Sequence, residues 1–143
     1  YIIINKNLDV CFKQIEEILG NVNNKNILIL GYSYKANLGD IRETPLQDFT
    51  RIAINNDANV FVWDPLVEKK LLPKDINHVE SLNDIRDIDI VVIGTAHEEV
   101  IEIEWSELML RCRNRNIYDG RRVLNKKNIE NMGWAYSGIG VPK

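Results

Sequence analysis

The segment NILILGYSYKANLGDIRETP, residues 26–45, determines the fold class that the sequence predicts. It opens with the nearly continuous apolar run Asn26–Leu30, which is typical of a strand buried on both faces of a sheet. A long polar loop follows, and Thr44 and Pro45 then begin a helix, because proline is favoured at the first helical position. The segment therefore predicts a strand–loop–helix unit.

The loop lacks the glycine pattern of a dinucleotide-binding turn. That fingerprint requires G-x-G-x-x-G directly after the strand. Here Gly31 is followed by Tyr32, and the next glycine is Gly39. We therefore predict a Rossmann-like layout in which this turn does not cradle a pyrophosphate.

Working outward, apolar runs and helix-like stretches alternate along the chain. Further strands are expected at Ala58–Trp63, Asp89–Ile93 and Asn116–Tyr118, and helices at Thr44–Asn55, Ser81–Arg86 and Glu104–Cys112. This alternation favours βαβ units and a parallel sheet. Before the first strand, Leu8–Leu19 carries apolar residues at helical spacing and ends at Gly20. We predict an α/β, Rossmann-like three-layer domain with a mainly parallel sheet, preceded by an N-terminal helix.

Composition excludes several classes of partner. The chain has 143 residues and a net charge of −3, so no global basic field would recruit nucleic acid or an anionic membrane. No window approaches the roughly 18 apolar residues of a membrane-spanning helix. Two cysteines without metal-type spacing indicate neither a disulfide framework nor a metal site, and favour a cytoplasmic location. Because the first residue is Tyr1, we expect a processed chain or part of a longer one.

Two loops carry cations at predicted strand ends. Lys35 and Arg42 lie between the first strand and its helix, and Arg121 follows Asp119 and Gly120 after the strand at Asn116–Tyr118. Cations near a helix N-terminus complement phosphate. If these two strands were neighbours, Lys35 and Arg121 would face one crevice. The alternative is that they are solvated surface charges.

Five motifs in order resemble one family. GYSYKANLGDIRETP is similar to the segment that opens the C-terminal domain of UDP-glucose/GDP-mannose dehydrogenases. Four further segments are similar to other parts of that domain: VFVWDP at 60–65, IVVIGTAH at 90–97, NIYDGRRVL at 116–124 and GWAYSGIG at 133–140. The leading helix resembles the end of the family's central dimerisation helix. The resemblance therefore implies two parts, residues 1–24 from that helical region and residues 25–143 as the UDP-binding domain.

The resemblance implies a role in an NAD-dependent UDP-sugar 6-dehydrogenase. Such enzymes oxidise the sugar C6 alcohol to a carboxylate in two steps and reduce two NAD, and a homodimer is expected for the full-length protein. The family's nucleophilic cysteine, catalytic lysine and NAD-binding domain lie upstream of the matching segment, so this chain alone is expected to be inactive. Cys11 and Cys112 are expected to be structural.

Four positions match ligand-contacting residues of the family. Tyr34, Lys35 and Arg121 match residues that contact the UDP part of the substrate, whereas Arg42 matches an arginine that reaches NAD bound by the other domain. With the resemblance, the functional interpretation of these four outweighs that of surface charges. His97 has no assigned chemistry and is expected to be a hydrogen-bonded structural histidine.

Asp64 occupies the place of a ribose-binding acid in nucleotide-binding Rossmann domains. Because the partner glycine motif is missing, we interpret Asp64 and Pro65 as a turn. Leu38 stands where UDP-glucose-specific members often have threonine, which leaves UDP-glucose and UDP-N-acetylated sugars both open.

Two other functions remain open. One is a free-standing Rossmann-like module that binds a nucleotide for regulation without catalysis. The other is a purely structural oligomerisation domain, which would leave Lys35, Arg42 and Arg121 unexplained.

Overall fold

The strands of the domain form a single parallel sheet. The computed structural model describes the backbone of residues 2–33, 35–41 and 44–138 and, within these ranges, the side chains from Val10 onward. The six strands have the order β3-β2-β1-β4-β5-β6, and every neighbouring pair is parallel. They are β1 (Asn26–Leu30), β2 (Asn59–Trp63), β3 (Asn77–His78), β4 (Ile90–Ile93), β5 (Asn116–Asp119) and β6 (Ala135–Ser137). This is the strand order of a doubly wound Rossmann fold, as predicted.

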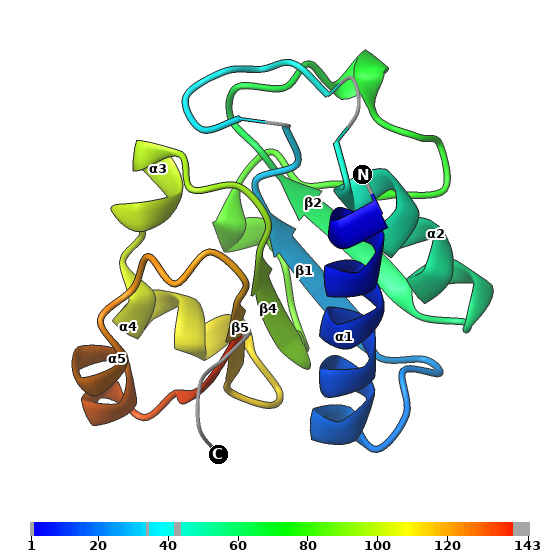
Figure 1. The fold of residues 1–143 in the computed structure, drawn as a ribbon. Helices are drawn as coiled ribbons and strands as arrows, with labels where there is room; N and C mark the ends of the chain where they lie inside the picture. Colours follow the sequence, from blue (N-terminus) through cyan, green and yellow to red (C-terminus); the bar gives the residue numbers. More distant parts are fainter. Residues whose placement is uncertain (1, 34, 42–43, 139–143) are drawn as a thin grey trace.

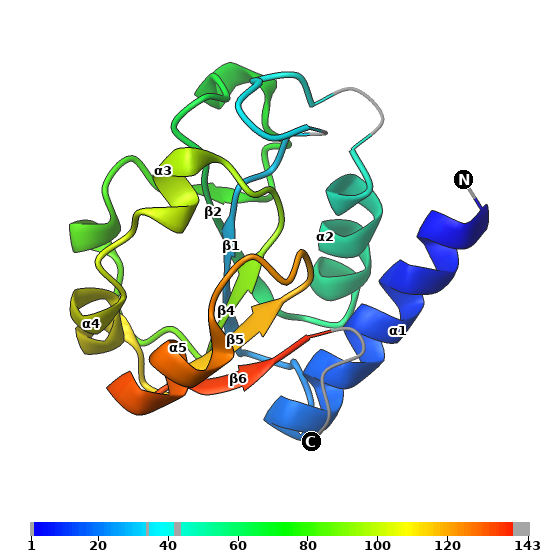
Figure 2. The ribbon, with the colours of Figure 1, turned by 60° about the vertical axis from the view of Figure 1, so that its left-hand side comes forward.

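Helices cover both faces of the sheet (Figures 1 and 2). On one face lie α1 (Ile2–Leu19) and α2 (Leu46–Asn55); on the other lie α3 (Glu98–Ile101), α4 (Trp105–Leu108) and α5 (Lys126–Met132). Three short 3₁₀ helices complete the chain: η1 (Lys69–Leu71), η2 (Leu82–Asp84) and η3 (Met109–Arg111). The predicted three-layer architecture with a leading helix is confirmed. No described helix is both long and apolar enough to cross a membrane.

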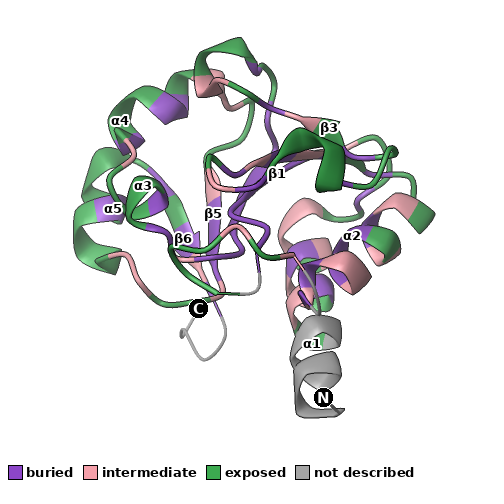
Figure 3. Cartoon of the chain, turned by 90° about the horizontal axis from the view of Figure 1, so that it is seen from above, coloured by how far each residue is buried: buried purple, intermediate pink, exposed green. Residues whose placement is uncertain are grey.

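Successive side chains of β1 enter two separate cores. Ile27 and Ile29 pack beneath α1 and α2, whereas Leu28 and Leu30 pack beneath the helices of the other face. Most residues of the central strands are accordingly buried (Figure 3). A strand covered on both faces has no solvent side that needs polar residues, and this is why its sequence does not alternate.

The leading helix is part of the packed domain. Phe12 of α1 meets Phe49 of α2 edge-on, with ring centroids 6.2 Å apart, and Ile15 is fully buried in the same core. The Tyr118 hydroxyl of β5 donates a hydrogen bond to Gln14. Whether residues 1–24 also belong to a dimerisation region stays a prediction.

The elements that the sequence did not predict are short or nearly free of buried apolar residues. The edge strands β3 and β6 have only two and three residues. Helix α5 buries only Ile129, so it shows no apolar stripe. Of the shorter helices expected, residues 81–86 form only η2, and residues 104–112 divide into α4 and η3.

A buried carboxylate joins the amino ends of the central strands. Asp89, fully buried just before β4, accepts two hydrogen bonds from Arg113 (2.9 and 2.7 Å), one from the Asn114 side chain (2.9 Å) and one from the Asn26 amide (2.8 Å). Burial raises the pKa of Asp89, but these hydrogen bonds outweigh burial and hold its pKa below the usual value. The ionised carboxylate therefore stabilises the fold.

We expect Asp89→Asn to lower the free energy of unfolding by about 2 kcal/mol at neutral pH, because Arg113 loses its charged partner. The folded-state pKa is lowered, so this stabilisation is present above the unfolded pKa of about 3.9 and is lost as the pH falls through the folded value. Urea denaturation at neutral and acidic pH measures both effects. Asp84→Asn, which removes an exposed carboxylate, is the control; an equal effect of both substitutions would contradict this role.

Candidate functional site

The sheet reverses its direction of winding between β1 and β4. In such sheets ligands bind outside the carboxyl ends of the strands at the reversal point. The loop after β1 leaves the sheet here, and its described residues 31–33 and 35–41 lie beyond the edge of the sheet (Figure 1). The chain after β4 leaves the same edge toward α3 on the other face. This edge is the candidate site.

Two glycines bring the ends of β1 and β4 into close contact. A Cβ atom on Gly31, whose φ is +85°, would lie 2.5 Å from the carbonyl oxygen of Thr95. A Cβ atom on Gly94 would lie 2.3 Å from the carbonyl oxygen of Gly31. Both positions therefore need glycine, one for its backbone angle and both for space.

Asp64 at the end of β2 holds the start of the loop. Its Oδ2 accepts hydrogen bonds from the amides of Tyr32 (2.7 Å) and Ser33 (3.2 Å), and its Oδ1 accepts one from Leu66 (2.9 Å). The Leu66 bond closes the turn expected at Asp64 and Pro65. Only 4% of Asp64 is exposed, so its carboxylate orients the loop and is not available to a ribose.

His97, after β4, is a second buried support for the loop. Its Nδ1 accepts a hydrogen bond from the amide of Asn37 (2.7 Å). Its Nε2 lies 3.0 Å from Asp64 Oδ2 and 3.0 Å from Ser33 Oγ. The Asn37 side chain in turn accepts a bond from the amide of Glu98 (3.1 Å). His97 is therefore a fully hydrogen-bonded buried histidine, as expected from the sequence.

The predicted site residues of this loop are only partly described. Lys35 is exposed, and its carbonyl oxygen accepts a hydrogen bond from Ser33 Oγ (3.0 Å). The main chain is thus fixed on both sides of Lys35, at Ser33 and at Asn37. Tyr34 and Arg42 lie outside the described residues.

Asp119 organises the second cationic loop. This fully buried carboxylate accepts hydrogen bonds from the amides of Arg121 (3.1 Å) and Leu124 (2.9 Å) and from the hydroxyl of Tyr136 (2.8 Å). Burial and the hydrogen bond to Asp119 raise the pKa of Tyr136, so the hydroxyl keeps its proton and donates it. The turn after β5 is therefore fixed from inside the domain.

Arg121 connects this loop to the reversal point. β5 is not a neighbour of β1, because β4 lies between them. The exposed Arg121 side chain nevertheless lies over the end of β4, where Nε donates to the carbonyl oxygen of Gly94 (3.0 Å). Since Gly94 contacts Gly31, the cationic loop after β5 reaches the place where the loop after β1 begins.

The roles of Ser33, Asn37 and Asp119 were not predicted from the sequence. A usable signal existed for Asp119, because a carboxylate that directly follows a buried strand must find hydrogen-bond partners. Ser33 and Asn37 carry no such signal, since polar residues are ordinary in loops.

Neither cysteine is in an environment that favours a thiolate. Burial raises the pKa of Cys11, and burial, outweighing the nearby Arg115, raises the pKa of Cys112 to about 12. A reactive cysteine needs the opposite surroundings. Within the described ranges, no cluster of three or more His, Cys, Asp or Glu side chains could hold a metal ion.

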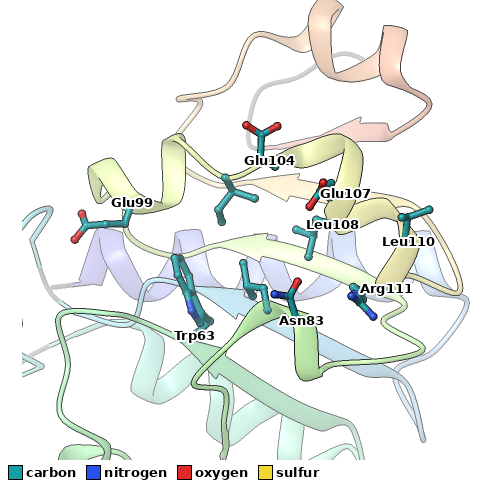
Figure 4. Close-up of a pocket in the computed structure, with 10 residues that line it drawn as sticks. Trp63, Asn83, Glu99, Glu104, Glu107, Leu108, Leu110 and Arg111 are labelled. Atoms are coloured by element: carbon teal, nitrogen blue, oxygen red, sulfur yellow. The ribbon is translucent and has the colours of Figure 1, made fainter.

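A separate hollow of about 310 Å³ lies on one face of the sheet, between Trp63 and the segment from α3 to η3 (Figure 4). Three of its four charged lining residues are glutamates, namely Glu99, Glu104 and Glu107, and the fourth is Arg111. Its net negative charge does not suit a phosphate ligand. The carboxyl edge with Lys35 and Arg121 remains the better candidate for an anion.

Comparison with known proteins gives consistent matches. A family model described as "UDP-glucose/GDP-mannose dehydrogenase family, UDP binding domain" matches residues 28–126. UDP-glucose 6-dehydrogenase of Rickettsia conorii is 32% identical over 126 residues, which cover 85% of this chain and 29% of the relative. The enzyme of the same name from Caenorhabditis elegans is 27% identical over 144 residues, which cover 90% of this chain and 30% of the relative.

Solved structures show the same fold. A UDP-D-ManNAc dehydrogenase from Pyrococcus horikoshii superposes with a TM-score of 0.74 at 25% identity, over 93% of this chain and 30% of that one. A UDP-glucose dehydrogenase from Pyrobaculum islandicum superposes with a TM-score of 0.76 at 23% identity, over 96% of this chain and 30% of that one. The chain thus spans less than a third of the length of these relatives.

We expect Gly31→Ala and Gly94→Ala each to lower the free energy of unfolding by about 2–4 kcal/mol, because the added methyl group meets backbone oxygen. Gly20 is the matched control: its φ is +84°, yet a Cβ atom there has nothing within 4 Å. Gly20→Ala should therefore cost only about 1 kcal/mol, from the backbone angle alone. Urea denaturation compares the three variants, and equal costs would contradict the close contact of β1 with β4.

Proposed function

This chain belongs to the UDP-glucose/GDP-mannose dehydrogenase family, and we propose that it binds the nucleotide part of a UDP-sugar within a longer NAD-dependent UDP-sugar 6-dehydrogenase. The observation that supports this most directly is the position of Arg121. Its guanidinium group is held by Gly94 over the reversal point of the sheet, where nucleotide ligands bind in related folds.

The chemistry of the two cations suits a diphosphate. Arginine offers several N–H donors in a planar arrangement that matches phosphate oxygens, and lysine adds a compact point charge. Lys35 and Arg121 are both exposed at the carboxyl edge of the sheet. In our proposal they bind the phosphates, and Tyr34 covers the nucleotide.

The complete protein, in our proposal, oxidises the C6 alcohol of the sugar to a carboxylate. Two hydrides pass to two NAD, and water supplies the second carboxylate oxygen. The sugar is glucose or an N-acetylated hexosamine, the two classes named in the relatives. Leu38, which is 53% exposed on the loop of residues 31–45, is the position in this chain that we relate to that choice.

The described residues do not fit a Rossmann-type NAD site. The first helix after β1 begins only at Leu46, the ends of β1 and β4 touch at Gly31 and Gly94, and Asp64 is already occupied by loop amides. We therefore propose that NAD is bound mainly by a separate domain of the longer protein. A contact from Arg42 to that NAD, a homodimeric assembly and a cytoplasmic location stay predictions.

We expect the 143-residue chain to bind UDP weakly in calorimetry, and Lys35→Ala combined with Arg121→Ala to abolish this binding. Two charge-assisted contacts, at about 1.5–3 kcal/mol each, correspond to a weakening of at least about 100-fold. Lys25→Ala combined with Arg51→Ala removes the same charge away from the carboxyl edge and should leave the affinity unchanged. Similar UDP affinity in both double variants would refute the site.

We also expect the isolated chain to produce no NADH from NAD and UDP-glucose, because the catalytic cysteine and lysine implied by the family lie outside it. Absorbance at the NADH band measures this directly. A full-length enzyme of the same family serves as the positive control. NADH formation by the purified chain would show that catalysis does not need the rest of the protein.

A further inference from the structure

The buried network behind Lys35 has a defined pattern of protons. The Asn37 amide has one proton, and it points to Nδ1 of His97 at 2.7 Å. Nδ1 must therefore be the unprotonated nitrogen, since two N–H groups cannot form a hydrogen bond with each other. The ring is then neutral, with its single proton on Nε2.

The surroundings of Nε2 agree with this tautomer. Asp64 Oδ2, 3.0 Å away, is a carboxylate acceptor. Ser33 Oγ, also 3.0 Å away, donates its own proton to the carbonyl oxygen of Lys35 and is thus left to accept. The Nε2 proton is therefore shared between two acceptors. Each side-chain nitrogen and oxygen of Ser33, Asp64 and His97 therefore has a partner.

These contacts determine where the main chain of Lys35 lies. Ser33 holds the carbonyl oxygen of Lys35, and His97 holds the amide two residues later, at Asn37. His97 and Asp64 have no exposed side-chain surface, so they cannot bind the ligand themselves. They can act on binding only through the loop.

We propose that His97 is a positioning residue for nucleotide binding: as the neutral Nε2–H tautomer it helps to hold Ser33 and Asn37, on either side of Lys35, and the affinity of the site for UDP depends on that tautomer. This inference rests on the proposed function, because it assigns the loop a nucleotide ligand. It adds a residue that does not touch the ligand and a protonation pattern on which binding depends.

The hydrogen bonds of the two ring nitrogens of His97 can be tested separately by substitution. In His97→Asn, the amide oxygen can accept from Asn37 near the Nδ1 position, but the donor to Asp64 is lost. In His97→Gln, the longer side chain can donate to Asp64 near the Nε2 position, but the acceptor for Asn37 is lost. Both variants lose a buried hydrogen bond, so an effect on stability alone would not distinguish them.

We expect His97→Gln to weaken UDP binding about 10-fold and His97→Asn to weaken it less than about 3-fold, as measured by calorimetry below the unfolding temperature of each variant. His78→Asn changes the only other histidine, on the edge strand β3, and should leave the UDP affinity unchanged. Equal UDP affinity in the unsubstituted chain, His97→Asn and His97→Gln would overturn the positioning role, as would a greater loss in His97→Asn.

Nitrogen NMR of the unsubstituted chain tests the tautomer without any ligand. With two histidines in the chain, the ring signals are simple to assign. We expect a protonated Nε2, an unprotonated Nδ1 and a scalar coupling between Nδ1 of His97 and the amide nitrogen of Asn37. An Nδ1–H tautomer or a missing coupling would overturn the inference. An intact coupling in a chain that does not bind UDP would instead contradict the proposed function, and the positioning role with it.

Discussion

The contact between the backbones of β1 and β4 at Gly31 and Gly94 is the constraint on which the candidate site depends. Two parallel strands with side chains at these positions could not bring their carboxyl ends so close. Because they do, the loop that leaves β1 and the loop that leaves β4 begin at one point and can share hydrogen bonds. The carbonyl oxygen of Gly94 is also the acceptor that brings Arg121 from β5 across to this point. The lack of side chains at Gly31 and Gly94 thus allows the residues that follow β1, β4 and β5 to meet at one point.

The fold could be predicted from the sequence because its central strands are buried on both faces. β4 is an apolar run and β1 is one after its first residue, Asn26, and α2 shows a clear stripe together with its initial Pro45. The edge strands β3 and β6 could not be predicted, since two or three residues show no periodicity. Helix α1 begins at Ile2, six residues before the predicted start at Leu8, and Ile4 continues the apolar stripe one turn earlier.

Residues of the site could be predicted only where they lie within a motif of a known family. Lys35 and Arg121 were identified because they lie within motifs of a known family, and the structure describes both at the carboxyl edge of the sheet. The polar network behind them was not predictable. Asn37 and His97 are 60 residues apart, and a hydrogen bond between them leaves no trace in a single sequence. Even the distance between the two cationic loops could be judged only from the strand order, because β4 lies between β1 and β5.

The same long separations have a consequence for the order of folding. A contact across 60 residues requires closure of a large chain loop before it returns any free energy. The side chains that hold Ser33 and Asn37 follow the ends of β2 and β4, so both strands must lie beside β1 before these hydrogen bonds can form. The hydrogen bonds that order the carboxyl edge therefore depend on the pairing of all three strands, and they cannot form while one of the three is unpaired. A change that weakens the pairing of β1 with either neighbour would accordingly disturb the binding edge as well as the core.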